Sequence, residues 1–434
     1  MNIPYTKRTL DNGLDVIVHE DHNLPMVAVN VWYHVGSKNE VPGRTGFAHL
    51  FEHLMFEGSE HHDRGYFPPL QRAGALLNGS TNADRTNYWE VVPTGALDLA
   101  LWMESDRMGY LLPALTDHKF NNQRDVVINE RRQNYENRPY GLAGIALSAA
   151  MYPGDHPYHW PTIGFTEDLR AASIDMVRDF FRTYYHPANA SLAIAGDVEA
   201  DRAFDLAERY FGELPAGLPV APVSAEARLR HNANVFIEDR VELPRLYVSW
   251  HSPAMFAPGD AELDIAADIL AHGKTSRLYK SLVYERRVAT DVSAYQHSRE
   301  IAGMFQVSCT AAAGVSLPQL HDAILAAISE LAAAGPTGAE LERGVAQTEA
   351  QFVYRIQTIG GFGGKGDQLN AYNTFVDDPG YFARDRQRYM DVTRADVAAA
   401  VAACLLNAPS VALSVVPKGK RDLALRDAVE VSVS

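Results

Sequence analysis

The sequence predicts an α+β protein built from two similar domains. At 434 residues the chain is too long for one ordinary hydrophobic core. In each half the strand-like segments are grouped rather than alternating strictly with helices, which is typical of a mainly antiparallel sheet packed with helices. A Pro- and Ala-rich stretch without hydrophobic periodicity separates the halves. We therefore expect an N-terminal domain over residues 1–220, a linker over 221–233 and a C-terminal domain over 234–434.

The first half contains four expected strands and, apart from the helix that carries His49 and His53, three expected helices. Residues 26–34 alternate in hydrophobicity with a period of two, which is typical of a strand. Pro113 is expected to end the first long helix, and Thr116 with Asp117 to begin the next. The strands are predicted at 15–19, 26–34, 86–92 and 190–196, and the helices at 96–112, 116–138 and 200–214.

The second half repeats this order of elements. Its strands are predicted at 234–237, 245–250, 304–310 and 410–416, and its helices at 261–270, 318–334, 338–356 and 397–406. Because the halves agree in element order and length, we expect an internal duplication. The glycine-rich segment 360–366 has the wrong spacing for a phosphate-binding loop and no Ser or Thr after Lys365, so it is predicted to be a flexible loop between helices.

The net charge of −15 restricts the classes of partner. It argues against nucleic acid, because phosphate binding requires a basic face. It would mildly favour basic peptides through long-range steering, although it also serves solubility alone.

The composition also bears on location. No run approaches the ~20 apolar residues of a membrane span. The first ten residues contain no apolar signal segment, so we expect a cytoplasmic protein, or a periplasmic one if a leader was removed. Cys309 and Cys404 lie in apolar surroundings and are expected to be buried thiols rather than a disulfide.

His49, Glu52 and His53 form the strongest chemical signal in the chain. At a helical period His49 and His53 lie one above the other, with Glu52 beside them. Apolar residues fill the adjoining faces, so a surface helix with scattered histidines is disfavoured. The other alternative is a core helix whose histidines bond the backbone. Buried imidazoles and a carboxylate require a partner, and zinc suits them: two imidazoles ligate it while Glu52 takes a proton from its water. The order His-x-x-Glu-His is the inverzincin signature.

A third metal ligand is expected from another helix, but the residues alone leave its identity open. Glu130 lies among apolar residues on a predicted helix, on the face that also carries Gln123 and Asn134. Glu104 and Asp106 on the preceding helix are equally eligible. Taken alone, Glu130 is better explained as a solvated charge.

With these residues in view, the chain resembles the pitrilysin family of zinc peptidases. Within that family it is most similar to the half-size branch, which includes the mitochondrial processing peptidase subunits and bacterial relatives. The resemblance spans nearly the whole chain. It rests on residues 36–40 (Gly-Ser-Lys-Asn-Glu), 49–53 with 56–58, Asn82 and Ala83 before Thr86 and Tyr88, 126–130, 184–189 leading into 195–197, and 276–279.

The resemblance implies a zinc-dependent endopeptidase that holds one Zn²⁺ ion per chain. The third ligand of the family aligns with Glu130, so the implied ligands are His49, His53 and Glu130. Glu52 would be the catalytic base.

The resemblance also implies how substrate is held. Asn82 and Ala83 would lie on an edge strand that binds the backbone of extended peptides or unfolded segments, a form of β-augmentation. The active chamber of the family is enclosed by four such domains. A half-size chain would therefore find the other two domains in a second subunit.

Two positions depart from the family pattern. Gln123 replaces a common Glu; it lies about 10 Å from Glu130 at helical rise and would tune the surroundings of the metal rather than bind it. Val283 and Thr290 stand where relatives carry an Arg and a Tyr that hold substrate. We therefore expect a heterodimer whose partner lacks the zinc motif and supplies that pair. The alternatives are an active homodimer or a non-enzymatic structural or assembly subunit.

Overall fold

The computed structural model describes residues 2–227 and 229–433, which form two compact units, each discontinuous in sequence. The first contains the chain up to Asn129, residues 161–223 and residues 351–384; the second contains the remainder. The predicted domains 1–220 and 234–434 therefore separate the two sheets but not all of the helices that cover them. Residue 228 of the expected linker lies outside the described residues, and the rest of 221–232 forms neither helix nor strand.

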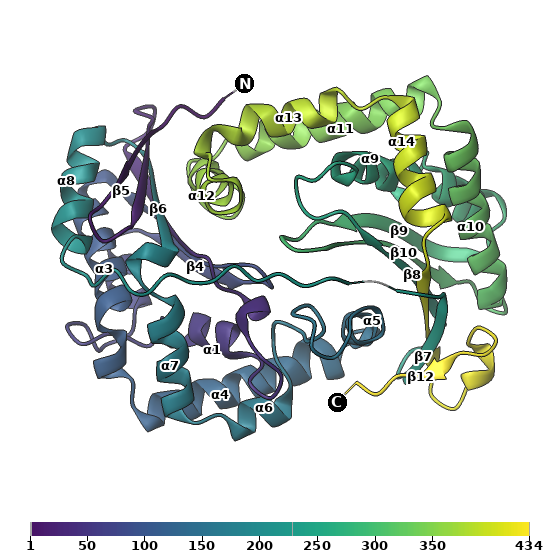
Figure 1. The fold of residues 1–434 in the computed structure, drawn as a ribbon, viewed down its shortest axis with the longest axis horizontal. Helices are drawn as coiled ribbons and strands as arrows, with labels where there is room; N and C mark the ends of the chain where they lie inside the picture. The colour runs from purple at the N-terminus through teal and green to yellow at the C-terminus, as the bar shows by residue number, and fades with distance from the viewer. Residues whose placement is uncertain (1, 228, 434) are drawn as a thin grey trace. The chain divides into compact units, whose positions relative to one another are not determined.

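The first sheet has six strands in the order β1-β2-β6-β3-β5-β4 (Figure 1). All neighbouring strands are antiparallel except β2 and β6. The strands are β1 (Thr6–Thr9), β2 (Asp15–Glu20), β3 (Met26–Tyr33), β4 (Leu76–Thr81), β5 (Thr86–Pro93) and β6 (Ala190–Gly196). The four expected strands are confirmed, and β1 and β4 form the two edges. Strand β1 was not predicted, and β4 was anticipated only through the edge strand that the family resemblance implied at Asn82 and Ala83.

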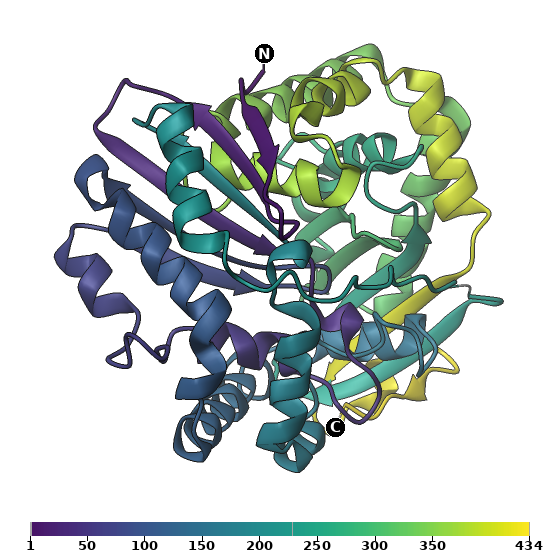
Figure 2. The ribbon, with the colours of Figure 1, turned by 60° about the vertical axis from the view of Figure 1, so that its left-hand side comes forward.

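Helices cover both faces of the first sheet. Figures 1 and 2 show α3 (Leu97–Ala114) and α8 (Ala200–Phe211) on one face, and Figure 1 shows α12 (Lys365–Val376) on the other. Helix α3 runs through Pro113, with non-helical backbone angles at Tyr110. The unit's other helices are α1 (Phe47–Leu54), α2 (Phe67–Arg72), α4 (Asp117–Arg131), α6 (Thr166–Ala171) and α7 (Ile174–Tyr184).

Helix α12 docks on the first sheet through hydrogen bonds rather than an apolar stripe. The buried carboxylate of Asp367 accepts from Trp32 Nε1 at 2.8 Å and from Asn87 Nδ2 at 3.0 Å. One turn on, Asn370 Nδ2 donates to the Asn30 carbonyl oxygen at 2.8 Å. The segment 360–366 connects α11 to this helix, as expected, and Lys365 already belongs to α12.

The second sheet has the order β12-β7-β11-β8-β10-β9, and its last five strands repeat the topology of the first sheet. The outer strand differs, because β12 is parallel to β7 whereas β1 is antiparallel to β2. Strands β7 and β11 are parallel, as β2 and β6 are, and the next three pairs are antiparallel. This repeated order supports the expected duplication. The strands are β7 (Ala233–Asp239), β8 (Arg245–Ser252), β9 (Ala289–His297), β10 (Gly303–Ala311), β11 (Ser410–Pro417) and β12 (Val429–Glu430).

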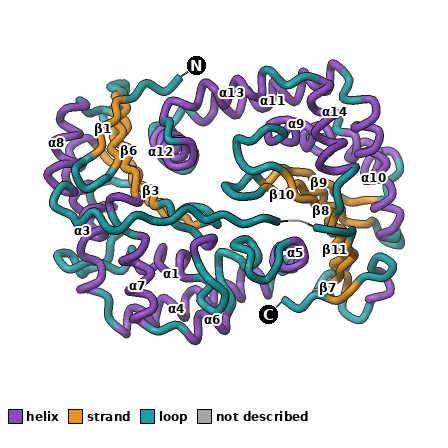
Figure 3. The backbone as a smooth tube through the Cα atoms, viewed as in Figure 1, coloured by secondary structure: helices purple, strands orange, loops and turns teal. Residues whose placement is uncertain are grey.

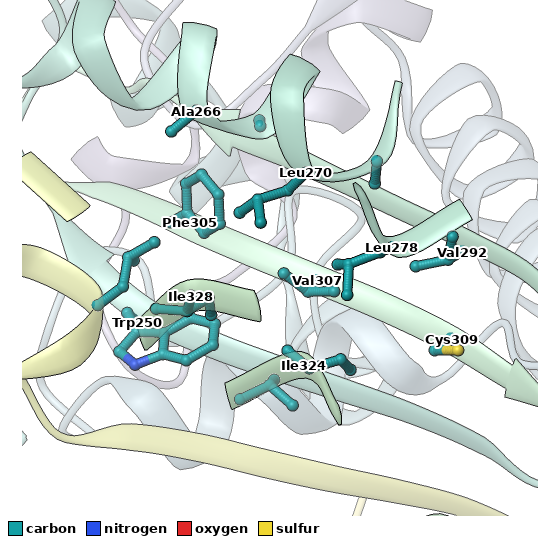
Figure 4. Close-up of a cluster of buried hydrophobic side chains, with 14 of the residues drawn as sticks. Trp250, Ala266, Leu270, Leu278, Val292, Phe305, Val307, Cys309, Ile324 and Ile328 are labelled. Atoms are coloured by element: carbon teal, nitrogen blue, oxygen red, sulfur yellow. The ribbon is translucent and has the colours of Figure 1, made fainter. Parts of the chain in front are cut away.

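The main core of the second unit lies between its sheet and α9 (Asp260–Ala271), α10 (Leu317–Ala334) and α14 (Arg394–Val401) (Figure 3). Figure 4 shows Trp250 and Phe305 from the strands facing Leu270 and Ile328 from the helices. Helix α5 (Ala143–Met151) covers the opposite face. The remaining helices are α11 (Gly338–Arg355) and α13 (Phe382–Met390).

Two further sequence predictions can be checked. Among the described residues, no helix combines the length and apolar character that crossing a bilayer requires. Cys309 and Cys404 are both free thiols, as expected, but only Cys309 is buried and Cys404 is partly exposed. Burial raises the pKa of the Cys309 thiol to about 12, so it is unreactive at neutral pH.

Candidate metal centre

Helix α1 presents two histidines and a glutamate on a half-buried face. His49, Glu52 and His53 are partly exposed, whereas the apolar residues between them are buried. The rings of His49 and His53 lie edge to face with centroids 4.9 Å apart, as their spacing predicted. Gly46 precedes the helix with a φ of 86°, and a side chain there would lie 2.9 Å from the Ile163 carbonyl oxygen. This close approach fixes the start of the helix.

Two carboxylates anchor the N-terminus of α1. The oxygens of buried Glu40 accept from the backbone N–H groups of Gly46 at 2.9 Å and Ala48 at 2.8 Å. Asp168 accepts from both the backbone and the hydroxyl of Thr45. Burial raises the pKa of Glu40 to about 8, although the helix N–H groups act in the opposite direction. The sequence reasoning did not find this anchoring.

An aromatic layer supports the buried side of α1. Phe51 stacks on Phe180 of α7 with centroids 5.8 Å apart and lies 5.1 Å from Tyr185. Phe56, just beyond the helix, meets Tyr88 of β5 edge to face at 5.5 Å. The polar face of α1 is therefore held by rigid packing on its opposite side.

Glu130 of α4 completes a group of three possible metal ligands. One ligand atom each from His49, His53 and Glu130 lies within 4.8 Å of the other two. All three side chains are half-buried. Within residues 2–227 and 229–433 this is the one such group of histidine, cysteine or carboxylate side chains.

The other two carboxylates that the sequence left open lie elsewhere. Glu104 forms a buried ion pair with Arg107. Asp106 accepts hydrogen bonds from Ser59 and His61. Neither belongs to the group that contains Glu130.

Gln123 lies on α4, and Asn134 lies in the π-helical turn that follows it. Gln123 Nε2 donates to Glu57, three residues beyond α1. Asn134 Nδ2 donates to Glu130 Oε1 at 3.3 Å. Gln123 therefore links α4 to the end of the histidine-bearing helix.

Arg85 is a positive charge near Glu52 that the sequence reasoning missed. Burial lowers the pKa of Arg85, while Asp367 and Glu52 act in the opposite direction. Its Nη1 donates to the Ser80 carbonyl oxygen at 2.8 Å, on edge strand β4. Arg85 therefore interacts electrostatically with the acidic side chain of α1 and through a hydrogen bond with β4.

The resemblance had implied that Asn82 and Ala83 lie on the edge strand, but the structure places both just beyond it. Strand β4 ends at Thr81, and both residues lie in the turn to β5. Their carbonyl oxygens accept from Ser37 N at 3.1 Å and Lys38 N at 2.8 Å. Because these oxygens are already engaged, the edge available for strand addition is that of β4.

The positions aligned with the Arg/Tyr pair carry no such groups. Val283 is half-buried and packs against the core of the second unit. Thr290 is exposed near the start of β9, and its hydroxyl donates to Asp291 at 3.2 Å. Neither side chain could reproduce a guanidinium or a phenol.

The donor set of the group fits zinc. Two imidazoles and one carboxylate are a ligand set of catalytic zinc sites, which keep one position open for water. Ligand atoms within 4.8 Å of one another are close enough to converge on a single ion. The fold and this group together define a duplicated α+β protein with a candidate catalytic-type zinc centre.

Comparisons with known proteins agree with this class. Residues 15–158 match the family described as insulinase, peptidase family M16, and residues 171–348 match the peptidase M16 inactive domain. The chain belongs to peptidase family M16.

Three relatives illustrate the similarity. The zinc protease PqqE of Helicobacter pylori is 29% identical over 81% of this chain and 80% of its own length. The crystal structure of a protease from Helicobacter pylori superposes with a TM-score of 0.87 at 25% identity, covering 96% of this chain and 100% of that one. The structure of a peptidase M16 inactive domain from Pseudomonas fluorescens has a TM-score of 0.84 at 19% identity, covering 96% and 98%.

Proposed function

We propose that this protein is a zinc-dependent endopeptidase that hydrolyses extended peptides or unfolded segments. The observation that carries the proposal is the grouping of His49, His53 and Glu130 beside Glu52. Relatives named zinc proteases support the same reaction.

The ligands would be His49, His53 and Glu130, holding one Zn²⁺ ion. When bound, zinc would supply a Lewis acid that activates a water molecule and polarises the scissile carbonyl. Glu52 takes the proton from the attacking water and later passes it to the leaving amine. The aromatic layer behind α1 keeps Glu52 and the two histidines in register.

The backbone of the substrate would pair with the free edge of β4. This strand ends the first sheet, so its outer N–H and C=O groups can form a ladder with an added strand. Asn82 and Ala83 then act by holding the turn that positions β4 rather than by binding the substrate backbone directly.

The active form would be a heterodimer. Val283 and Thr290 leave this chain without the Arg/Tyr pair that relatives use to hold substrate. A homologous partner without the zinc motif would supply that pair and the other two domains of the chamber.

The experiment measures zinc content and cleavage of a mixed peptide library. Glu52→Gln should keep zinc and lose turnover by orders of magnitude, whereas Glu130→Gln should lose the metal. Glu60→Gln and Asp125→Asn, at exposed positions, serve as matched controls and should retain both properties.

The outcomes separate the three possibilities. Cleavage that appears only with a homologous chain carrying the Arg and Tyr supports the heterodimer. Full activity of the purified chain contradicts an obligatory partner. Absence of cleavage with and without the homologue would leave a non-enzymatic subunit, and near-normal turnover of Glu52→Gln would remove that residue from its role.

A further inference from the structure

A polar cavity of about 530 Å³ lies in the second unit, beside the C-terminal end of α4. One wall is formed by the segment that follows Glu130, and the other by the start of β8. The side chains that line it are Asn134, Tyr135, Arg138, Tyr140, Arg245 and Tyr247. Two guanidinium groups and three phenols make this an unusually donor-rich surface in a chain of net charge −15.

The wall contributed by residues 134–141 has a specialised backbone. Residues 132–136 form a π-helical turn directly after α4, a geometry that is frequent at functional sites. Tyr140 has a positive φ of 61°, which is strained for a residue with a large side chain. Its N–H donates to Asp239 Oδ2 at 2.7 Å and its hydroxyl to the Leu243 carbonyl oxygen at 2.8 Å. The surrounding structure therefore holds this wall in place.

The opposite wall fixes a guanidinium against Tyr140. Arg245 lies 3.9 Å from the centroid of the Tyr140 ring, and its Nε donates to Thr310 Oγ1 at 2.7 Å. Two acids lie nearby: Asp291, which is half exposed, is 3.7 Å from Arg245 Nη2, and Asp239 is engaged by the Tyr140 N–H. Arg138 is exposed and forms no ion pair with any residue that the structure describes. Arg138 therefore gives the cavity one guanidinium that no described ion pair neutralises.

The cavity is linked to the candidate metal centre through Glu130. Asn134 lines the cavity and also donates to Glu130 Oε1 at 3.3 Å. One helical turn separates the two residues, a rise of about 6 Å. An extended peptide covers that distance in about two residues.

We propose that this cavity is a subsite for a carboxylate of the peptide substrate, located about two to three residues from the bond that is cleaved. The inference rests on the proposed function. The planar guanidinium of Arg245 suits a carboxylate, and Arg138 adds a second positive charge. The acidic chain would favour basic peptides overall, but at this one substrate position it would favour an acidic residue.

The test measures binding of matched peptides to the zinc-loaded Glu52→Gln chain, so the readout does not require turnover. The peptides carry Glu or Gln at each position within about three residues of the centre, and each ends in a free carboxylate or an amide. The peptide with Glu at one particular position, or the peptide with a free carboxylate, should bind about tenfold more tightly than its Gln or amide counterpart. The difference in affinity should be smaller at high salt. Which of the two does so identifies the source of the carboxylate.

The preference should disappear in Arg138→Gln/Arg245→Gln and persist in Arg426→Gln, an exposed control in the same unit. If Arg245→Gln does not fold, the exposed Arg138→Gln alone should reduce the preference and Arg138→Lys should restore it. Equal binding of all Glu and Gln peptides, acids and amides, overturns the subsite even if the native chain cleaves them. Discrimination in binding without any cleavage by the native chain, either alone or with the homologous partner, refutes the peptidase and leaves the subsite standing.

Discussion

Replacing Arg107 with methionine should destabilise the metal-free protein by about 3–5 kcal/mol. The side chain is 1% exposed, and its Nε donates to Glu104 Oε2 at 2.9 Å. The guanidinium lies 3.9 Å from the ring centroid of Tyr66 and 4.0 Å from that of Tyr88. Methionine would fill much of the space but leave the Glu104 carboxylate buried without a counter-charge.

A second buried acid increases this cost. Burial raises the pKa of Glu90 far above its usual range, Glu104 raises it further, and Arg107 acts in the opposite direction. Without Arg107, Glu90 loses the positive charge that offsets its burial beside Glu104 and must be protonated to remain buried. Since protonation is less costly at low pH, the loss of stability should be larger at pH 8 than at pH 5.

Urea unfolding of wild type, Arg107→Met and Glu104→Gln/Arg107→Met provides the test. The double variant should recover at least half of the lost free energy of unfolding, because it removes the buried charge. Arg209→Met, at an exposed position of α8, should change stability by no more than about 0.5 kcal/mol. The reasoning is refuted if Arg107→Met stays within about 1 kcal/mol of wild type, or if the double variant is no more stable than the single one.

Three further predictions concern Glu40 at the start of α1, Asp367 on α12, and the candidate zinc ligands. Burial raises the pKa of Glu40 from 4.5 to about 8. As pH rises between these values, wild type should therefore lose stability relative to Glu40→Gln by on the order of 1 kcal/mol per pH unit. Parallel pH profiles of the two proteins in urea unfolding would contradict this. Asp367→Ala leaves the donors of Trp32 and Asn87 buried and should cost about 2–4 kcal/mol, whereas Asp205→Ala, at an exposed position of α8, should cost little. Free zinc at about 100 times its Kd should stabilise wild type by about 2.7 kcal/mol and Glu130→Gln hardly at all, so equal Tm shifts on chelation would argue against the ligand set.

The strands at the centre of each sheet could be predicted from sequence, whereas the edge strands could not. Strand β3 is apolar and buried along most of its length, so its sequence is easily recognised as a strand. Strands β1 and β4 are short, polar and largely exposed, so their sequences carry no hydrophobic period. Helix α12 escaped prediction for a related reason, because it docks through Asp367 and Asn370 rather than through an apolar stripe.

The candidate metal centre likewise has features that the sequence predicts and others that it does not. The spacing of His49 and His53 is local and follows from helical geometry. The approach of Glu130 depends on packing between helices far apart in sequence, and only the family resemblance selected it over Glu104 and Asp106. The contacts of Glu40 with the start of α1 and of Arg245 with Tyr140 are tertiary, so no periodic pattern in the sequence predicts them.

The exchange of covering helices has a consequence for biosynthesis. The first sheet contains only residues up to Gly196, yet α12, which covers one of its faces, begins at Lys365. A ribosome releases the whole second sheet except its last two strands before that helix emerges. One polar face of the first sheet therefore stays uncovered until translation is nearly finished. A chain cut in the linker would yield two incomplete fragments, because residues 351–384 belong to the first unit and residues 130–160 to the second.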